Sequence, residues 1–395
     1  MEPFSRVILK PGKEQSIKRL HPWIFSGAIK KIEGKPVEGD TVEIFSNTGE
    51  YLATGHYQIG SIAVRIYSFH QVTPDFNFWT NKFKSAWDLR SALGLTDNRD
   101  TNVYRLINGE GDGMPGFIVD YYNGIVVMQM HSVGMYLLRE QLAEVIKALC
   151  GDKLLSIYDK SEGTIPVKAG LGIKNKFIYG DQSVIEITEN GCRFSIDVIS
   201  GQKTGFFIDQ RENRQLLTRY IKGKDVLNMF CYTGGFSVYA LQGGAASVDS
   251  VDSSSQAVEL TKKNVSLNPE STGRHQTFTE DAFSFLNDIA DKYDVIILDP
   301  PAFAKHTDAL ENALMAYKRL NAKAIEQIRP GGIIFTFSCS QVVNRDNFRR
   351  SVFVAAANTG RNVRILHQLV QPPDHPVSIF HPEGEYLKGL VLQVE

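Results

Sequence analysis

Apolar and polar residues alternate in short stretches over roughly the first 70 residues, and turn-forming residues separate these stretches. Alternation with a period of two predicts half-buried β-strands, and several short strands in succession predict a small β-barrel. The strands expected here have the sequences SRVILK, TVEIFS, YLATGHY and SIAVRIYSF. We therefore assign residues 1–73 to a first, all-β domain.

The pattern changes after residue 73 to a mixture of helical and strand periods. FWTNKFKSAWDLRSAL and YLLREQLAEVIKAL have the helical period, and YNG between two apolar stretches predicts a tight hairpin turn. Glycines recur nearby, but they stand between two strand candidates and precede no helix, so they are interpreted as turns rather than a phosphate loop. These are Gly109, Gly111, Gly113 and Gly116. Residues 74–180 are expected to form a small α+β domain.

Strand and helix patterns alternate regularly in the rest of the chain, after a hairpin with the sequence VIEITENGCRFSIDV. Such alternation is typical of a doubly wound parallel sheet with helices on both faces. The expected strands are DVLNMF, SVDSVD, HQTFTED, DVIILDPP and GGIIFTFSCS. We predict an α/β, Rossmann-like domain over residues 181–395.

Composition excludes several classes of protein. The chain has 395 residues, of which 43% are hydrophobic and 22% charged, as in ordinary globular domains. No apolar run approaches the roughly 18 residues of a membrane span, and the start MEPFSRVILKPGK is no signal peptide, so we expect a cytoplasmic protein that does not bind membranes. The four cysteines are scattered without a CxxC pair, which indicates neither a metal site nor a disulfide framework.

Basic and aromatic residues gather between residues 10 and 31. Six lysines and arginines there face one acid, Glu14, and Trp23 and Phe25 lie among them. Aromatic rings beside positive charge suit base stacking together with phosphate contact, so Lys18, Arg19 and Trp23 are candidate RNA-binding residues. On charge alone a solvated basic face is the favoured interpretation, and for the two rings filling of the barrel's core is an equal alternative to base stacking. The net charge of −1 argues against indiscriminate nucleic-acid binding but allows a local basic groove.

Ligands of doubly wound sheets bind beyond the carboxyl ends of the strands. The first expected strand is followed by a glycine loop, which lets backbone approach a ligand closely. The second ends at Asp252 and Ser253, where an acid can bind both ribose hydroxyls, and the third is followed by Asp281 and Ala282, which could clasp an adenine. The glycine loop comprises Phe230, Tyr232, Thr233, Gly234 and Gly235. This set specifies a nucleoside without phosphates, and S-adenosylmethionine fits that description.

The fourth and fifth strands end in two groups that could act on a nucleobase. Asp299 begins a D-P-P sequence whose prolines stiffen the backbone, so its carboxylate can be aimed at a bound ring and at the cofactor. Cys339 follows the neighbouring strand. C5 of cytosine is a poor nucleophile, and addition of a thiolate at C6 makes it enamine-like, which divides one hard step into two easier ones. We expect Cys339 to be the nucleophile and Asp299 to hydrogen-bond near N3.

Several strings closely resemble the RlmI-type ribosomal RNA methyltransferases, and the resemblance spans essentially the whole chain. The matching strings are HPWIFSGAI, QKTGFFIDQREN, NMFCYTGGFS, LDPPAFAK, FSCS, QPPDHP and EGEYLKGL. The resemblance implies a PUA domain, a small middle domain and a class I methyltransferase domain. It also implies formation of 5-methylcytosine in large-subunit (23S) ribosomal RNA, with S-adenosylmethionine as donor. Gln210 and Arg211, in FIDQREN, would help to hold cofactor or RNA, and Lys305 would contact RNA.

One feature departs from many cytosine-5 methyltransferases, which carry a cysteine directly after the D-P-P or a similar motif. Here Ala302 and Phe303 follow, so a single cysteine would serve both addition and elimination. Methylation of another atom, such as guanine N7 or an amino group, therefore stays open, with Cys339 a bystander. A non-catalytic RNA-binding assembly protein is the alternative of another class. The partners expected are ribosomal RNA and, as a homodimer, a second copy of the chain.

Overall fold

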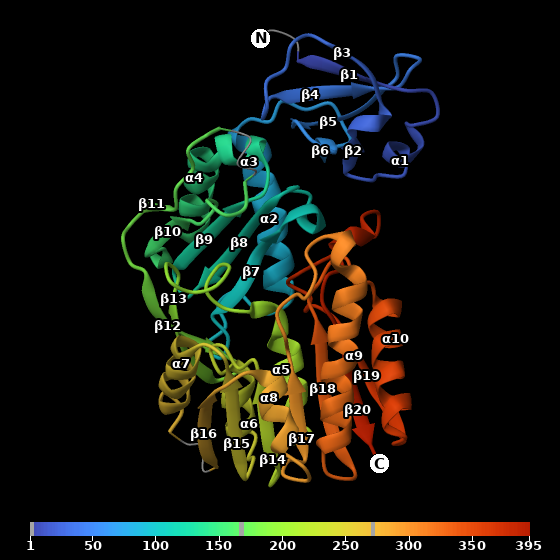
Figure 1. Cartoon of the computed structure of the whole chain (residues 1–395). Helices are drawn as coiled ribbons and strands as arrows, with labels where there is room; N and C mark the ends of the chain where they lie inside the picture. Colours follow the sequence, from blue (N-terminus) through green and yellow to red (C-terminus); the bar gives the residue numbers. More distant parts are fainter. Residues whose placement is uncertain (1–3, 166–169, 270–272) are drawn as a thin grey trace. The chain divides into compact units, whose positions relative to one another are not determined.

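A computed structural model describes residues 4–165, 170–269 and 273–395, and the chain forms two compact units. Both units are assembled from segments that are distant in the sequence (Figure 1). Unit 1 comprises residues 1–187, 196–206 and 373–384; unit 2 comprises residues 188–195, 207–372 and 385–395. The three-domain division at residues 73 and 180 stays a prediction.

Unit 1 begins with a six-stranded sheet in the order β2-β6-β5-β4-β1-β3. Its strands are β1 (Ser5–Leu9), β2 (Trp23–Phe25), β3 (Ile29–Glu33), β4 (Thr41–Phe45), β5 (Tyr51–Tyr57) and β6 (Ile62–Ser68), with the short helix α1 (Gln15–Lys18) before β2. All four predicted strands are confirmed. The sequence pattern did not reveal β2 and β3, because neither strand shows a clean alternation: β2 has three residues, and in β3 two polar residues stand side by side.

The rest of unit 1 is built on a five-stranded sheet in the order β11-β10-β9-β8-β7. Its elements are α2 (Phe76–Ala92), β7 (Val103–Asn108), β8 (Phe117–Tyr122), β9 (Ile125–Met130), α3 (Val133–Leu137), α4 (Arg139–Cys150), β10 (Ser156–Asp159) and β11 (Lys176–Tyr179). The predicted hairpin turn lies at Asn123-Gly124, both with positive φ. Gly113 and Gly116 lie in turns with positive φ, as predicted, whereas Gly109 and Gly111 belong to a short 3-10 helix over Gly109–Asp112.

A separate two-stranded sheet, β12 (Val184–Glu189) and β13 (Cys192–Asp197), precedes the main sheet of unit 2. Its turn lies at Asn190-Gly191, as predicted. The tip of this hairpin belongs to unit 2, where the buried carboxylate of Glu189 forms a bidentate ion pair with Arg214, both N–O distances being 2.8 Å. The hydroxyl of Tyr239 also donates to Glu189.

The main sheet of unit 2 has seven strands in the order β16-β15-β14-β17-β18-β20-β19. They are β14 (Asp225–Met229), β15 (Ser247–Asp252), β16 (Arg274–Thr279), β17 (Val295–Leu298), β18 (Gly332–Ser338), β19 (Val363–Leu369) and β20 (Lys388–Val394). The first five strands in chain order pair in parallel, as predicted. β20 runs antiparallel between β18 and β19, an arrangement that the sequence pattern did not reveal.

Helices cover both faces of this sheet (Figure 1), and consecutive strand residues face opposite cores. In β17, Ile296 and Leu298 belong to one core, whereas Val295 and Ile297 belong to the other. The helices of unit 2 are α5 (Arg211–Leu217), α6 (Gly235–Gln242), α7 (Ser255–Ser266), α8 (Ala282–Phe285), α9 (Leu310–Gln327) and α10 (Arg345–Thr359). The predicted α/β class is confirmed. No helix in the described ranges is long and apolar enough to cross a membrane.

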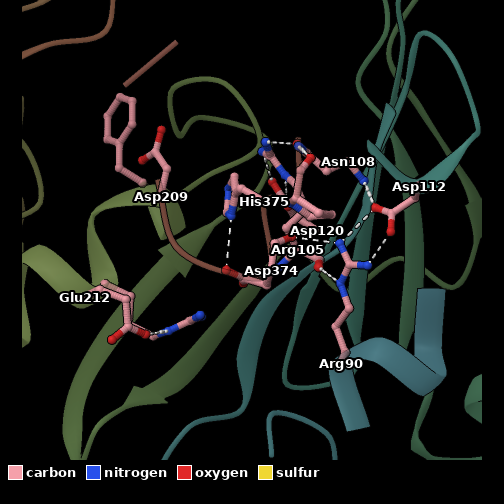
Figure 2. Close-up of polar contacts among 12 residues, drawn as sticks. Arg90, Arg105, Asn108, Asp112, Asp120, Asp209, Glu212, Asp374 and His375 are labelled. Atoms are coloured by element: carbon pink, nitrogen blue, oxygen red, sulfur yellow. Dashed lines mark hydrogen bonds and ion pairs between the residues drawn. The ribbon is translucent and has the colours of Figure 1, made fainter. Parts of the chain in front are cut away.

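The segment 373–384 leaves unit 2 after β19 and packs within unit 1 before β20 begins. The guanidinium of Arg90 is fully buried and donates to both carboxylate oxygens of Asp112 and to the backbone carbonyl of Asp374 (Figure 2). The Asp374 carboxylate in turn accepts from the backbone N–H of Arg105. A Cβ at Gly111 would lie 1.9 Å from the carbonyl oxygen of Pro376, so only glycine allows this close approach. Residues of the QPPDHP sequence therefore pack and hydrogen-bond within unit 1.

Candidate active site

The loop after β14 has an unusual backbone. Phe230 and Tyr232 have φ values of 59° and 45°, and Gly234, with φ 75°, precedes α6. Left-handed backbone is unfavourable for residues with a Cβ and tends to occur at functional sites. A Cβ at Gly234 would lie 2.8 Å from the Thr261 side chain, so this position also requires glycine. The loop, including Thr233 and Gly235, thus lies close against α7.

Asp252 at the end of β15 ties this loop to the next one. One carboxylate oxygen accepts from the backbone N–H of Tyr232 at 3.1 Å, and the other accepts from that of Ser254 at 2.9 Å. The Asp252 side chain is half-buried, and Ser253 beside it is exposed. Each carboxylate oxygen can accept a further hydrogen bond, so Asp252 can bind a ribose hydroxyl while it holds the loop.

Asp281 begins α8 and accepts from the backbone N–H of Ser284 at 3.0 Å, which makes it an N-terminal cap. Asp281 is exposed and Ala282 behind it is buried. The loop after β16 is therefore preformed by its own capping bond. A planar base could lie against it without any rearrangement of that cap.

Gln210 and Arg211 are almost fully buried, at the junction between a short 3-10 turn and α5. Gln210 accepts from the Asn213 side chain, and the preceding Asp209 accepts from the hydroxyl of Tyr386 at 2.8 Å. Arg214 donates to the carbonyl of Phe207. The segment FIDQREN is thus held firmly within unit 2, an arrangement that no local feature of the sequence indicates.

Asp299 and Cys339 follow directly paired strands. Leu298 at the end of β17 is in register with Thr336 in β18, so Asp299 and Cys339 both lie just beyond this edge of the sheet. Both are half-buried. Burial raises the pKa of Tyr317 in α9 to about 12, and the nearby Cys339 and Asp299 add to that rise. Both the thiol and the carboxylate are therefore near enough to this hydroxyl group to act on it electrostatically.

The other three cysteines are buried, and burial raises the pKa of each thiol. The values are about 11 for Cys150 and about 12 for Cys192 and Cys231. Only the thiolate is nucleophilic, so these three are poorly suited to attack a base. Of the four, Cys339 is the one that is not fully buried.

Lys388 is a residue of this region that the sequence analysis missed. It begins β20, opposite Ser338 in the register of β18, and only 6% of its surface is exposed. Its Nζ donates to the backbone carbonyl of Ser340 at 2.5 Å. Burial lowers the pKa of Lys388 to about 8, and the nearby Cys339 opposes that change. The sequence signal is a lysine at the start of a mainly apolar strand.

The candidate RNA-binding residues lie in both units, Lys305 being exposed in unit 2. In unit 1, Lys18 and Arg19 are exposed, and Lys18 pairs with Glu50 at 2.6 Å. A surface pocket opens beside them. It is lined by Leu9, Lys13, Ser16, Ile17, Trp23, Ile24, Phe25, Gly27 and Ala28.

Trp23 has both structural contacts and a place in this pocket. Its indole N–H donates to Glu110 at 2.7 Å, and its ring lies 4.3 Å from that of His381 and 5.4 Å from the Arg65 guanidinium. Phe25, by contrast, is 47% exposed. Phe25 therefore does not fill the core of the barrel, whereas Trp23 is engaged within unit 1, and RNA binding by this region stays a prediction.

Comparison with known proteins decides the family. The family model of S-adenosylmethionine-dependent methyltransferases matches residues 176–386, and that of PUA-like domains matches residues 7–69. A relative from Aeromonas hydrophila, named ribosomal RNA large subunit methyltransferase I, is 40% identical over 98% of both chains. The chain belongs to this methyltransferase family. A relative of the same name from Escherichia coli is 38% identical over 98% of this chain and 99% of its own.

The fold has close counterparts among solved structures. A candidate SAM-dependent methyltransferase from Streptococcus mutans superposes with a TM-score of 0.83 at 23% identity, covering 98% of this chain and all of its own. SMU.776, a candidate methyltransferase complexed with SAH, gives a TM-score of 0.85 at the same identity and coverage. The cofactor of this family is S-adenosylmethionine, as predicted, and the left-handed loop after β14 and the carboxylate of Asp252 fit a nucleoside of that kind.

Proposed function

We propose that this chain methylates C5 of a cytosine in large-subunit (23S) ribosomal RNA through a covalent bond between Cys339 and C6. The observation that carries the proposal is that Asp299 and Cys339 follow adjacent, directly paired strands at the same edge of the sheet. The names of the relatives support the ribosomal substrate. The PUA-like domain supports RNA binding.

The thiolate of Cys339 would add to C6, so that a sulfur–carbon bond forms and the electron pair of the C5–C6 double bond becomes available at C5. A protonated Asp299 would donate a hydrogen bond near N3 and so hold the ring and stabilise the negative charge that develops on it. S-adenosylmethionine, when bound, supplies an electrophilic methyl group. A base then takes the C5 proton, the C–H electron pair restores the C5–C6 double bond, and the sulfur–carbon bond breaks to release the Cys339 thiolate.

The residues that would hold the donor lie at three consecutive strand ends. The loop from Phe230 to Gly235 brings backbone close to it, Asp252 would bind its ribose, and Asp281 with Ala282 would flank its adenine. Gln210 and Arg211 are buried in the same unit and would stabilise that site.

On the RNA side, Lys18, Arg19 and Lys305 would contact phosphates, and Trp23 with Phe25 would meet an unpaired base. A stacked base costs a few kcal/mol to extrude, so we expect the target cytosine to be single-stranded or weakly paired. The homodimer stays a prediction.

The test replaces the nucleophile. Cys339→Ala and Cys339→Ser should lose turnover by several orders of magnitude while they keep S-adenosylmethionine affinity, because the thiol acts on the base and not on the donor. Cys150→Ala, at the end of α4 in unit 1, is the matched control and should retain turnover. RNA carrying 5-fluorocytosine should trap a protein–RNA adduct with the parent and not with Cys339→Ala, since fluorine blocks loss of the C5 substituent.

Mass spectrometry of the methylated nucleosides identifies the product atom. Turnover that persists in Cys339→Ala would refute the covalent mechanism and favour methylation of a ring nitrogen or an amino group. Absence of S-adenosylmethionine binding in calorimetry would instead point to a non-catalytic RNA-binding protein.

A further inference from the structure

Lys388 lies at the same edge of the sheet as the proposed nucleophile. β20 is antiparallel to β18, and Lys388 pairs with Ser338, the residue immediately before Cys339. The lysine amine then reaches past the end of β18 and donates to the carbonyl of Ser340, the residue immediately after Cys339. Its contacts therefore bracket the cysteine on both sides in the sequence.

A lysine in this position is unusual, because buried lysines are rare unless they have a partner. The carbonyl of Ser340, which accepts the hydrogen bond from Lys388, is neutral and cannot balance a positive charge. The other charged groups that act on Lys388 are Arg345 and Glu385, which pair with each other at 3.2 Å and are both exposed. Arg345 lowers the pKa of Lys388 and Glu385 raises it, so their effects offset each other. Of the three groups, Cys339 is then the one whose negative charge can balance the buried ammonium group.

We propose that Lys388 is a positioning residue for Cys339: its ammonium group favours the thiolate, and its bond to Ser340 holds the turn that carries the sulfur. This inference rests on the proposed function, in which Cys339 attacks the base. An ordinary thiol has a pKa near 8.5 and is only a few per cent thiolate at pH 7. A neighbouring cation lowers the pKa of a thiol and so raises the thiolate fraction.

The same electrostatic attraction also acts on the pKa of Lys388. Burial lowers the pKa of Lys388 to about 8, and Cys339 opposes this because a thiolate favours the ammonium form. The two groups thus stabilise each other's charged form. Burial raises the pKa values of Cys150, Cys192 and Cys231.

The experiment measures the Cys339 thiol in the full-length protein without RNA or donor. Alkylation by iodoacetamide is followed across pH, with the modified cysteine identified by mass spectrometry. We expect the parent midpoint to lie below that of an ordinary thiol. Lys388→Met, which removes the charge at similar volume, should raise the midpoint by about one unit or more, whereas Lys388→Arg should retain most of the depression. Arg345→Gln, which removes an exposed cation of the same neighbourhood, is the matched control and should shift it less.

A Lys388→Met midpoint equal to that of the parent would overturn the proposal. A parent midpoint at or above the ordinary thiol value would overturn it as well, and this measurement needs no variant to fold. The two proposals fail separately: active Cys339→Ala refutes the covalent function even where the midpoint shifts, and an unshifted midpoint refutes the role of Lys388 even where Cys339→Ala is inactive.

Discussion

The buried ion pair between Arg90 and Asp112 offers a quantitative test of what holds unit 1 together. Asp112→Asn keeps the size of the side chain and removes its charge. The Arg90 side chain is fully buried and that of Asp112 is 4% exposed, so water cannot replace the lost carboxylate. An asparagine amide would also turn a donor towards either the guanidinium or the backbone N–H of Asn108, both of which now donate to Asp112.

The expected cost follows from the uncompensated charge. Removal of one partner from a buried, hydrogen-bonded ion pair typically costs about 3–5 kcal/mol, because the remaining ion stays buried without a counter-charge. With a urea m-value of about 2 kcal/mol per M, this corresponds to a midpoint lower by roughly 1.5–2.5 M. That is a large share of the roughly 5–15 kcal/mol by which most domains are stable.

Tryptophan fluorescence is a suitable assay, because all three tryptophans of the chain lie in unit 1. Trp79 and Trp87 are on α2, the helix that also carries Arg90, and Trp79 is fully buried. The control is Glu144→Gln on α4, which removes an exposed ion pair with Lys147. Exposed pairs contribute about 0–1 kcal/mol, so the control should unfold close to the parent. An Asp112→Asn cost below about 1 kcal/mol would show that burial adds nothing here and refute the reasoning.

Two further predictions concern pH and cofactor affinity. Burial lowers the pKa of His56 from 6.5 to about 4, so protons bind preferentially to unfolded chains; stability present above pH 6.5 should be lost progressively towards pH 4, by up to roughly 3 kcal/mol. His56→Gln should reduce the loss of unfolding free energy between pH 6.5 and pH 4, measured by fluorescence. An unchanged dependence on pH would contradict the claim that His56 causes this loss. Asp252→Ala should weaken S-adenosylmethionine binding by about 10–100-fold in calorimetry, since hydrogen bonds to a charged group contribute about 1.5–3 kcal/mol. Glu259→Gln, which removes an exposed carboxylate on the following helix α7, serves as its control, and equal affinity of the two variants would argue against a ribose contact.

Local patterns were sufficient to predict the framework of the candidate site. The period-two and helical stretches predicted the parallel strands β14 to β18. Because parallel strands end at a common edge of the sheet, Asp252, Asp299 and Cys339 were predicted to lie at that edge. The turns at Asn123-Gly124 and Asn190-Gly191 were equally predictable, because left-handed backbone needs particular residues. These features depend on neighbours within a few positions, so the sequence carries them directly.

The contacts that complete the site depend on partners far apart in the chain. The Lys388 amine meets a carbonyl 48 residues earlier, and Arg90 meets one 284 residues later, in Asp374. Neither lysine nor arginine has a local pattern that reveals burial, because both residue types are usually exposed. The sequence by itself determined the parallel strands β14 to β18, the hairpin turns and the chemical groups at the strand ends. Only the tertiary structure decided which charges are buried together, since burial and pairing arise when distant segments exclude water from the same place.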